Sequence, residues 1–137
     1  MNLIEAFKKV YIEDIFTVKT RASRMEYWGG ELIAIPGMFV VVFISYFISI
    51  GLGDLISNIL IFWSSVATIT VSIRRMHDVG KSGWVLLWNL TIIGTLYTFV
   101  LSVTQSEQED NEWGSPRPHT ILNNNSSEEE AQKETGE

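Results

Sequence analysis

The chain has 137 residues and no cysteine, which excludes disulfide scaffolds and thiolate metal sites. Its formal net charge is −6, with 10 Lys and Arg against 16 Asp and Glu, and no basic surface is large enough for nucleic acid. The charges are segregated, because residues 32–73 contain only Asp54 and residues 84–103 contain none. Uncharged stretches of this length indicate a membrane protein rather than a soluble domain.

Residues 2–16 are predicted to form an amphipathic helix. Apolar side chains recur there at helical spacing, at Leu3, Ile4, Phe7, Val10, Tyr11 and Ile15. We expect this helix to lie in the cytoplasmic membrane interface, and the alternative is a helix that docks a partner. We expect no cleavable signal peptide, because residues 1–31 hold ten charges and lack an early apolar core. Residues 1–22 are therefore predicted to be a cytoplasmic interfacial segment.

Ser23 and Glu26 match a capping box, which predicts that the first spanning helix begins near Arg24. Pro36 and Gly37 within this helix predict a kink or a weakened turn.

Three segments approach the length of about 20 mostly apolar residues that crosses about 30 Å of hydrocarbon. We predict an all-α membrane protein with three spans, at about 32–50, 55–73 and 84–103. The Gly-rich residues 51–54 predict a tight turn, so that the first two spans form a helical hairpin. The transmembrane domain is predicted to cover residues 23–104.

Residues 105–137 are predicted to be a polar acidic tail. This segment has too little apolar area to offset the entropy of ordering, so we expect disorder.

Polar and aromatic side chains mark how the spans are expected to pack. The small residues Ser64, Thr68 and Ser72 share one face of the second span, and Asn89 is expected to hydrogen-bond across this packing seam. Aromatic rings that prefer the headgroup level flank the spans at Tyr27, Trp28, Trp84 and Trp88. No charged residue or histidine lies deep in a span, which counts against an ion-coupled transporter.

The distribution of Lys and Arg predicts the orientation. Residues 1–31 hold five of them and residues 74–83 hold three, whereas residues 51–54 hold none. Basic residues favour the cytoplasmic side, so we expect the N-terminus and the 74–83 loop in the cytoplasm. Three crossings then place the C-terminal tail outside.

The helix ends are expected to bring two charged segments together at the cytoplasmic face. The residues are Arg21, Arg24, Glu26, Arg74, Arg75, His77, Asp78 and Lys81. In a structural interpretation, Arg21 or Arg24 pairs with Asp78. Arg74 or Arg75 then pairs with Glu26, and the pairs clamp the first helix to the loop between the second and third spans.

Two other interpretations of these charges remain open. Arginine matches phosphate oxygens, so the basic residues could bind an anionic lipid headgroup. A remote alternative is catalysis by His77 on a phosphate-bearing lipid, although no nucleophile elbow, phosphate loop or metal signature is present.

Three motifs carry a resemblance to a known family. The first contains Phe16, Arg21, Arg24, Glu26, Tyr27 and Trp28; the second contains Arg74, Arg75, Met76, His77, Asp78, Gly80 and Trp84; the third contains Asn111, Trp113, Gly114 and Pro116. The sequence resembles the domain of unknown function 805 family, the YhaH-like small bacterial inner-membrane proteins. Thr20 stands where the family usually has Gly. Acidic residues stand where the family has a Gly-rich segment before the third motif.

The resemblance implies a bacterial inner-membrane location and no particular activity. We expect a membrane scaffold or interaction protein, not an enzyme, with no cofactor and no metal. Its expected partners are membrane lipids and a second copy or a larger membrane protein.

Overall fold

The computed structural model describes residues 1–116, and this part of the chain is mostly helical, as the sequence predicts. The elements are α1 (Leu3–Lys8), the π-helix η1 (Lys9–Glu13), α2 (Arg24–Ile48), α3 (Ile50–Asp78), the 3-10 helix η2 (Gly83–Leu90) and α4 (Ile92–Val103). The predicted disorder of the tail from residue 117 onward lies outside the described residues.

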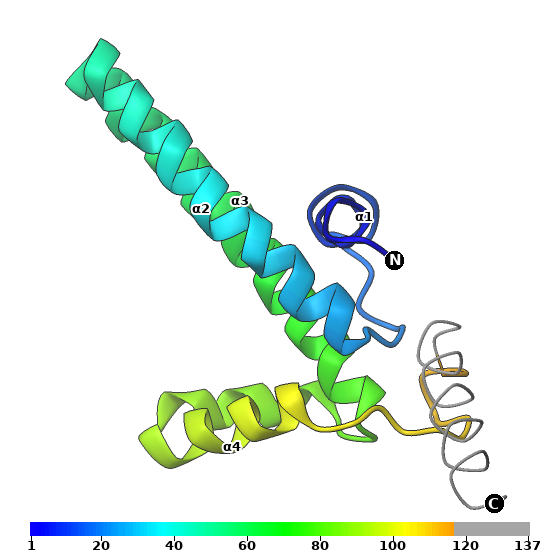
Figure 1. The fold of residues 1–137 in the computed structure, drawn as a ribbon. Coiled ribbons are helices and arrows are strands. Elements are labelled where there is room, and N and C mark those ends of the chain that lie inside the picture. Colours follow the sequence, from blue (N-terminus) through cyan, green and yellow to red (C-terminus); the bar gives the residue numbers. More distant parts are fainter. Residues whose placement is uncertain (117–137) are drawn as a thin grey trace, which may run out of the picture.

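Helices α2 and α3 pack against each other and form the long hairpin of Figure 1. They contain 25 and 29 residues. At about 1.5 Å per residue, each helix is longer than the roughly 30 Å of a hydrocarbon core. Their outer faces are apolar and exposed, with Phe39, Phe47 and Phe62 each more than 70% exposed. Two helices of this length and exposure, in a chain this apolar, are those of a membrane protein.

Helix α2 begins as predicted at Arg24. The side chain of Ser23 accepts a hydrogen bond from the backbone N–H of Glu26, at 3.2 Å. The Glu26 carboxylate binds the guanidinium of Arg74. The helix continues without a break through Pro36 to Ile48.

The turn of the long hairpin lies at Ser49, so the prediction of a turn over residues 51–54 is wrong. Ser49 has an extended backbone, with φ −166° and ψ 138°, and α3 begins at the next residue. Gly53 is buried against Tyr46, and a Cβ atom on Gly53 would lie 2.7 Å from carbons of that ring. The glycine therefore allows close packing of two helices, a use that differs from the turn conformation that we expected.

Residues 84–103, predicted as one spanning helix, form a second and shorter hairpin. Extended backbone at Thr91, with φ −120° and ψ 151°, separates η2 from α4. Helix α4 has 12 residues, and Figure 1 shows it returning toward the end of α3. About 18 Å of helix is too short to cross about 30 Å of hydrocarbon, so a continuous third span is not formed.

The reversal at Thr91 is stabilised by hydroxyl groups and a glycine. The Thr91 hydroxyl donates to the Trp88 carbonyl at 2.9 Å and accepts from the Gly94 N–H at 3.1 Å. The Thr95 hydroxyl donates to the Thr91 carbonyl at 3.0 Å. A Cβ atom on Gly94 would lie 1.8 Å from the Trp88 carbonyl oxygen, so only glycine permits this approach. Hydropathy over 84–103 does not reveal a reversal made from such contacts.

The N-terminal helical segment, residues 3–13, lies across the long hairpin, and Figure 1 shows it along its axis. The segment ends at Glu13, three residues before the predicted end at residue 16. Two glycines of α2 allow its close approach: a Cβ atom on Gly29 would lie 3.1 Å from Ala6 Cβ, and one on Gly30 would lie 3.1 Å from Val10 Cγ2. The segment is therefore fixed against the hairpin as well as being amphipathic.

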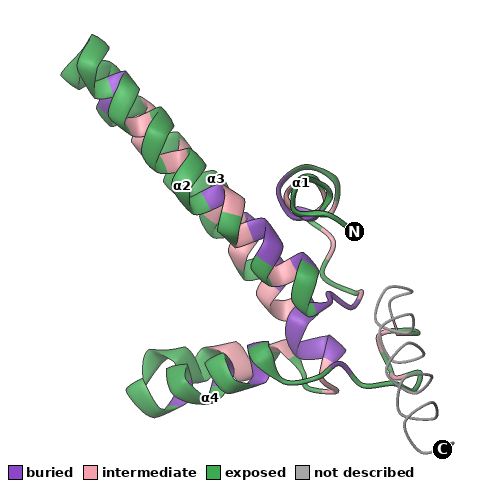
Figure 2. Ribbon diagram, in the orientation of Figure 1, coloured by how far each residue is buried: buried purple, intermediate pink, exposed green. Residues whose placement is uncertain are grey.

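Burial is concentrated at one end of the long hairpin, where α2 begins and α3 ends; we call this end the base. Figure 2 shows the base in purple, whereas the far part of the long hairpin and most of α4 are exposed. The buried apolar residues there include Val10, Tyr11, Ala22 and Val71. Burial raises the pKa of Tyr11 to about 12, so this side chain is a neutral phenol at physiological pH.

Candidate functional site

Five charged side chains meet at the base and are almost completely buried. Arg21 is 1% exposed, and Arg74, Arg75, Glu26 and Asp78 are 0% exposed. We call these five residues the arginine cluster. The last turns of α3 supply three of them, the first turn of α2 supplies Glu26, and Arg21 precedes α2. Buried charges are stable only when they are paired and hydrogen-bonded, so their partners decide what the cluster can do.

Asp78 is the acceptor at the centre of the arginine cluster. Its Oδ1 atom accepts from Arg21 Nε at 3.1 Å. Its Oδ2 atom accepts from Arg75 Nη1 and from the hydroxyl of Ser106. One carboxylate thus joins the segment before α2, the end of α3 and the segment after α4.

The two guanidinium groups at Asp78 also bind main-chain carbonyl oxygens in the last turn of α4 and in the segment after it. Arg75 donates from Nε to Ser102 O at 3.0 Å and from Nη2 to Thr104 O. Arg21 donates from Nη1 to Glu109 O at 2.9 Å and to Gly114 O at 3.2 Å. Both arginines therefore fix the path of residues 102–114 along the base.

Arg74 makes a separate set of contacts with the N-terminal part of the chain. Its Nη2 atom pairs with Glu26 and with Asp14 Oδ2, the latter at 3.0 Å. Its Nε atom donates to Thr20 Oγ1 at 3.0 Å, whereas its Nη1 atom has no hydrogen-bond partner among the described residues. The carbonyl of Arg74 accepts from the N–H of Ala22 at 3.0 Å. Asp14 thus adds a third carboxylate beside the three guanidinium groups, and Lys9 Nζ lies 3.9 Å from Glu26 Oε1 as a further cation.

The structure selects between the pairings that the sequence left open. Arg21, and not Arg24, pairs with Asp78, and Arg74, and not Arg75, pairs with Glu26. Arg24 is exposed and outside the arginine cluster. Lys81 is exposed as well, in the loop after α3.

His77 and Asp78 are adjacent in the sequence but contact different neighbours. Its ring stacks on the Trp113 ring, with 4.4 Å between centroids and 6° between planes. Asn111 Nδ2 donates to the His77 carbonyl at 3.0 Å. Trp113 and Asn111 belong to the third motif, so the structure brings all three motifs to the base. Sequence reasoning missed this contact because it placed the third motif across the membrane.

The described part of the tail therefore lies at the same end of the molecule as the 74–83 loop. Glu107 N donates to the Asp78 carbonyl at 2.9 Å, in addition to the arginine contacts of this segment. Three complete crossings would place this segment on the opposite side of the membrane from the 74–83 loop. In the structure, residues of the two segments are in direct contact.

The three small residues of the predicted packing seam contact different neighbours. Thr68 Oγ1 donates to Glu31 Oε1 of α2 at 2.8 Å, and Ser64 Oγ donates to the Ile61 carbonyl of its own helix at 3.2 Å. Ser72 faces a cavity next to the short hairpin. The three residues share a helix face, but they do not form one continuous packing seam against a single neighbouring helix.

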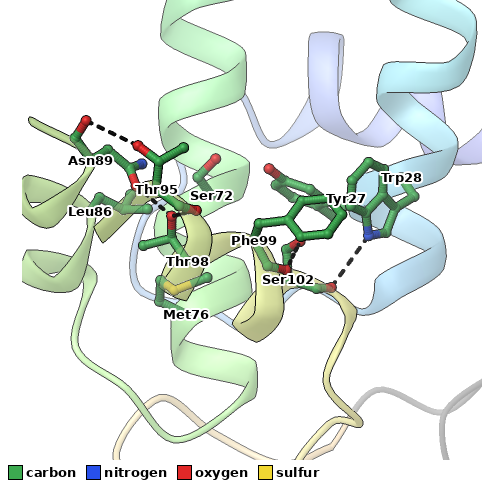
Figure 3. A pocket seen from close by; sticks show the side chains of 10 residues that line it. All are labelled: Tyr27, Trp28, Ser72, Met76, Leu86, Asn89, Thr95, Thr98, Phe99 and Ser102. Atoms are coloured by element: carbon green, nitrogen blue, oxygen red, sulfur yellow. Dashed lines mark hydrogen bonds between the residues drawn. The ribbon is translucent and has the colours of Figure 1, made fainter. Parts of the chain in front are cut away.

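This cavity, about 200 Å³, lies between the base and the short hairpin (Figure 3). It is lined by Tyr27, Trp28, Ser72, Met76, Leu86, Asn89, Thr95, Thr98, Phe99 and Ser102. Trp28 Nε1 donates to the Ser102 carbonyl at 3.3 Å, and the Thr98 hydroxyl donates to Asn89 Oδ1. Asn89 thus binds within the short hairpin rather than across to the second span. The polar groups of the cavity are largely bonded to one another, as in a packing contact between hairpins.

The predicted interface aromatics divide into two groups. Tyr27 and Trp28 lie in the first turns of α2, where Trp28 packs edge-on against Phe99 of α4 at 6.0 Å between ring centroids. Trp84 and Trp88 on η2 are 77% and 62% exposed. Within residues 1–116, no group of three or more His, Cys, Asp or Glu side chains is placed to hold a metal ion.

Comparisons with known proteins agree with the motifs. Residues 15–115 match the family described as protein of unknown function (DUF805). The inner membrane protein YhaI of Escherichia coli strain K12 is 34% identical over 96 residues, which cover 69% of this chain and 80% of that protein. The protein of the same name in Escherichia coli O157:H7 gives the same values. No solved structure matches the chain.

Proposed function

The chain belongs to the DUF805 family of proteins of unknown function, and we propose that it is a small membrane scaffold whose arginine cluster is structural. In this function the cluster fixes the two hairpins and the N-terminal segment relative to one another. The assembled base then presents the apolar faces of both hairpins to lipid and to other membrane proteins.

The observation that carries this proposal is that each of the three buried guanidinium groups is bound to groups of the chain itself, with only Arg74 Nη1 left without a partner among the described residues. Arg21 and Arg75 share Asp78 and donate to carbonyl oxygens, and Arg74 binds two carboxylates. All three side chains are at most 1% exposed. A lipid phosphate needs arginine donors that face it, so these contacts favour the structural interpretation over lipid binding at the cluster. They also use Asp78 fully, which disfavours an acid–base pair with His77.

We place the protein in the bacterial inner membrane with its base in the cytoplasm. The relatives are named inner membrane proteins, and the Lys- and Arg-rich segments 1–31 and 74–83 meet at the base. Residues 104–116 are bonded to the base and share its side. The long hairpin then crosses the membrane, and the short hairpin enters and leaves it on the cytoplasmic face.

Exposed apolar surface supports an interaction role. Phe43 and Phe47 of α2 pack edge-to-face with 5.0 Å between ring centroids, and they are 65% and 77% exposed. In lipid, helices associate through packing of such faces, so the proposed partners are a second copy or a larger membrane protein.

The structural role of the arginine cluster predicts a large effect of Arg75→Ala. This change removes donors to Asp78 and to three carbonyl oxygens, and we expect the free energy of unfolding in detergent to fall by about 3 kcal/mol. Thermal unfolding of the purified protein measures this, and lipid extracted with it is quantified in parallel. The matched control is Arg24→Ala, an exposed arginine on the same face, for which we expect almost no change. Loss of a bound phospholipid at unchanged stability would contradict the structural role.

The proposed topology predicts a labelling pattern. Because the chain has no cysteine, single cysteines can be introduced at exposed positions 51, 81 and 115. In cells with a permeable outer membrane and an intact inner membrane, a membrane-impermeant maleimide should label position 51 alone. Positions 81 and 115 should react together once the inner membrane is opened. Labelling of 115 together with 51 would contradict the shared side of the base and the tail.

A further inference from the structure

A second hollow of the base lies outside the arginine cluster. It is a groove of about 500 Å³ between the last turns of α3 and the start of η2. Its lining includes Lys19, Ile69, Ile73, His77, Trp84 and Trp113. The hydrogen bonds and ion pairs of the arginine cluster described above do not involve the residues that line this groove.

The groove changes from apolar to polar along α3. Ile69 comes 19 residues after Ile50, the first residue of α3, and His77 comes eight residues after Ile69. At about 1.5 Å per residue, Ile69 lies about 29 Å along the helix, at the edge of a hydrocarbon core of about 30 Å, and His77 lies about 12 Å further on. The groove thus leads from the edge of the hydrocarbon through the level of lipid headgroups.

The polar end of the groove carries one basic side chain. Lys19 is exposed there. His77 also lines this end, but it is 7% exposed and its Nδ1 atom is enclosed by the chain. None of the described residues that line the groove carries a carboxylate. This end therefore suits an anionic group.

We propose that this groove binds one anionic phospholipid molecule. Its phosphate lies beside Lys19, and part of one acyl chain lies along Ile69, Ile73 and Trp84. A free phosphate ion would use only the polar end, whereas Ile69 and Trp84 are 58% and 77% exposed on the apolar side. One lysine near an anionic headgroup contributes roughly 1 kcal/mol, about a five-fold preference for an anionic lipid over a zwitterionic one.

Native mass spectrometry of the full chain in detergent tests this site. Phosphatidylglycerol, and in parallel phosphatidylcholine with the same acyl chains, is titrated in, and the Kd of the first bound lipid is measured. We expect phosphatidylglycerol to bind about five-fold more tightly. Lys19→Gln should abolish this preference without weakening phosphatidylcholine binding. The matched control Lys8→Gln, an exposed lysine on α1, should retain the preference.

A second pair of variants tests the apolar end of the groove. Ile69→Trp fills this end and should raise the Kd of both lipids about five-fold or more. Ile59→Trp introduces the same ring ten residues earlier on α3, where the isoleucine is 57% exposed, and should leave both Kd values unchanged.

Three results would overturn the proposal. One is an unchanged Kd in Ile69→Trp with a folded protein, and another is an equal loss in Ile59→Trp. The third is loss of the anionic preference in Lys8→Gln as well as in Lys19→Gln, which would indicate a diffuse charge effect. Thermal unfolding of each variant separates a lost lipid site from a lost fold.

Discussion

Asp78→Asn is expected to destabilise the protein by about 3–5 kcal/mol, because it leaves two buried guanidinium groups without their shared carboxylate. Arg21 and Arg75 are 1% and 0% exposed and cannot turn to water without opening the base. The asparagine keeps the shape of the side chain, so lost packing contributes little. Unfolding in detergent, followed by circular dichroism against temperature or denaturant, measures the loss.

The control for this change is Glu13→Gln, which neutralises an exposed carboxylate of η1. We expect it to alter the free energy of unfolding by less than about 0.5 kcal/mol. Equal stability of Asp78→Asn and the unmodified chain would show that the arginine cluster does not hold the base together.

Gly94→Ala is expected to open the short hairpin at a free-energy cost of about 3 kcal/mol. The added methyl group would stand 1.8 Å from the Trp88 carbonyl oxygen, which belongs to the backbone and cannot rotate away. Helices η2 and α4 must therefore move apart, and this disturbs the packing of Trp28 on Phe99 at the base. Thermal unfolding measures the effect, together with the intrinsic fluorescence of the tryptophans.

Gly37→Ala is the matched control on α2, because nothing lies within 4 Å of a Cβ atom at that position. Alanine is the better helix former, so this variant should be equal to the unmodified chain or slightly more stable. Equal stability of Gly94→Ala and Gly37→Ala would contradict the close contact at Thr91 and leave a continuous third helix possible.

The long hairpin was predictable because its signals are local. Helix α2 begins where Ser23 caps it, and both helices follow from long uncharged runs. The turn was misplaced because Gly53 has two possible uses. In the structure it accommodates the Tyr46 ring, and pattern alone does not distinguish a packing glycine from a turn glycine.

The short hairpin was not predictable from hydropathy, because its reversal depends on contacts at one point. The Thr91 hydroxyl binds the Gly94 N–H at the start of α4, and the Thr91 and Thr95 hydroxyls add second hydrogen bonds to carbonyl groups that backbone N–H groups also bind. The predicted third crossing separated the third motif from the base, whereas the structure places this motif at the base. That error hid the stacking of Trp113 on His77 and the contact between Arg21 and the Gly114 carbonyl.

The site itself was predictable as a set of residues but not as a set of partners. Arg21 and Asp78 belong to motifs that the sequence displays, and their pairing was one of two alternatives. Arg24 belongs to the same motif as Arg21, but it is exposed at the start of α2. Only the packing of the segment before α2 on the end of α3, where the Ala22 N–H binds the Arg74 carbonyl, shows which arginine is directed inward.

The use of main-chain oxygens by Arg21 and Arg75 has an evolutionary consequence. Every amino acid carries a carbonyl, so a substitution that preserves the course of residues 102–114 also preserves the acceptors. A change of the Glu109 side chain, for example, leaves in place the carbonyl that Arg21 binds. The base is therefore expected to constrain the two arginines and the backbone route more than the side chains along that route.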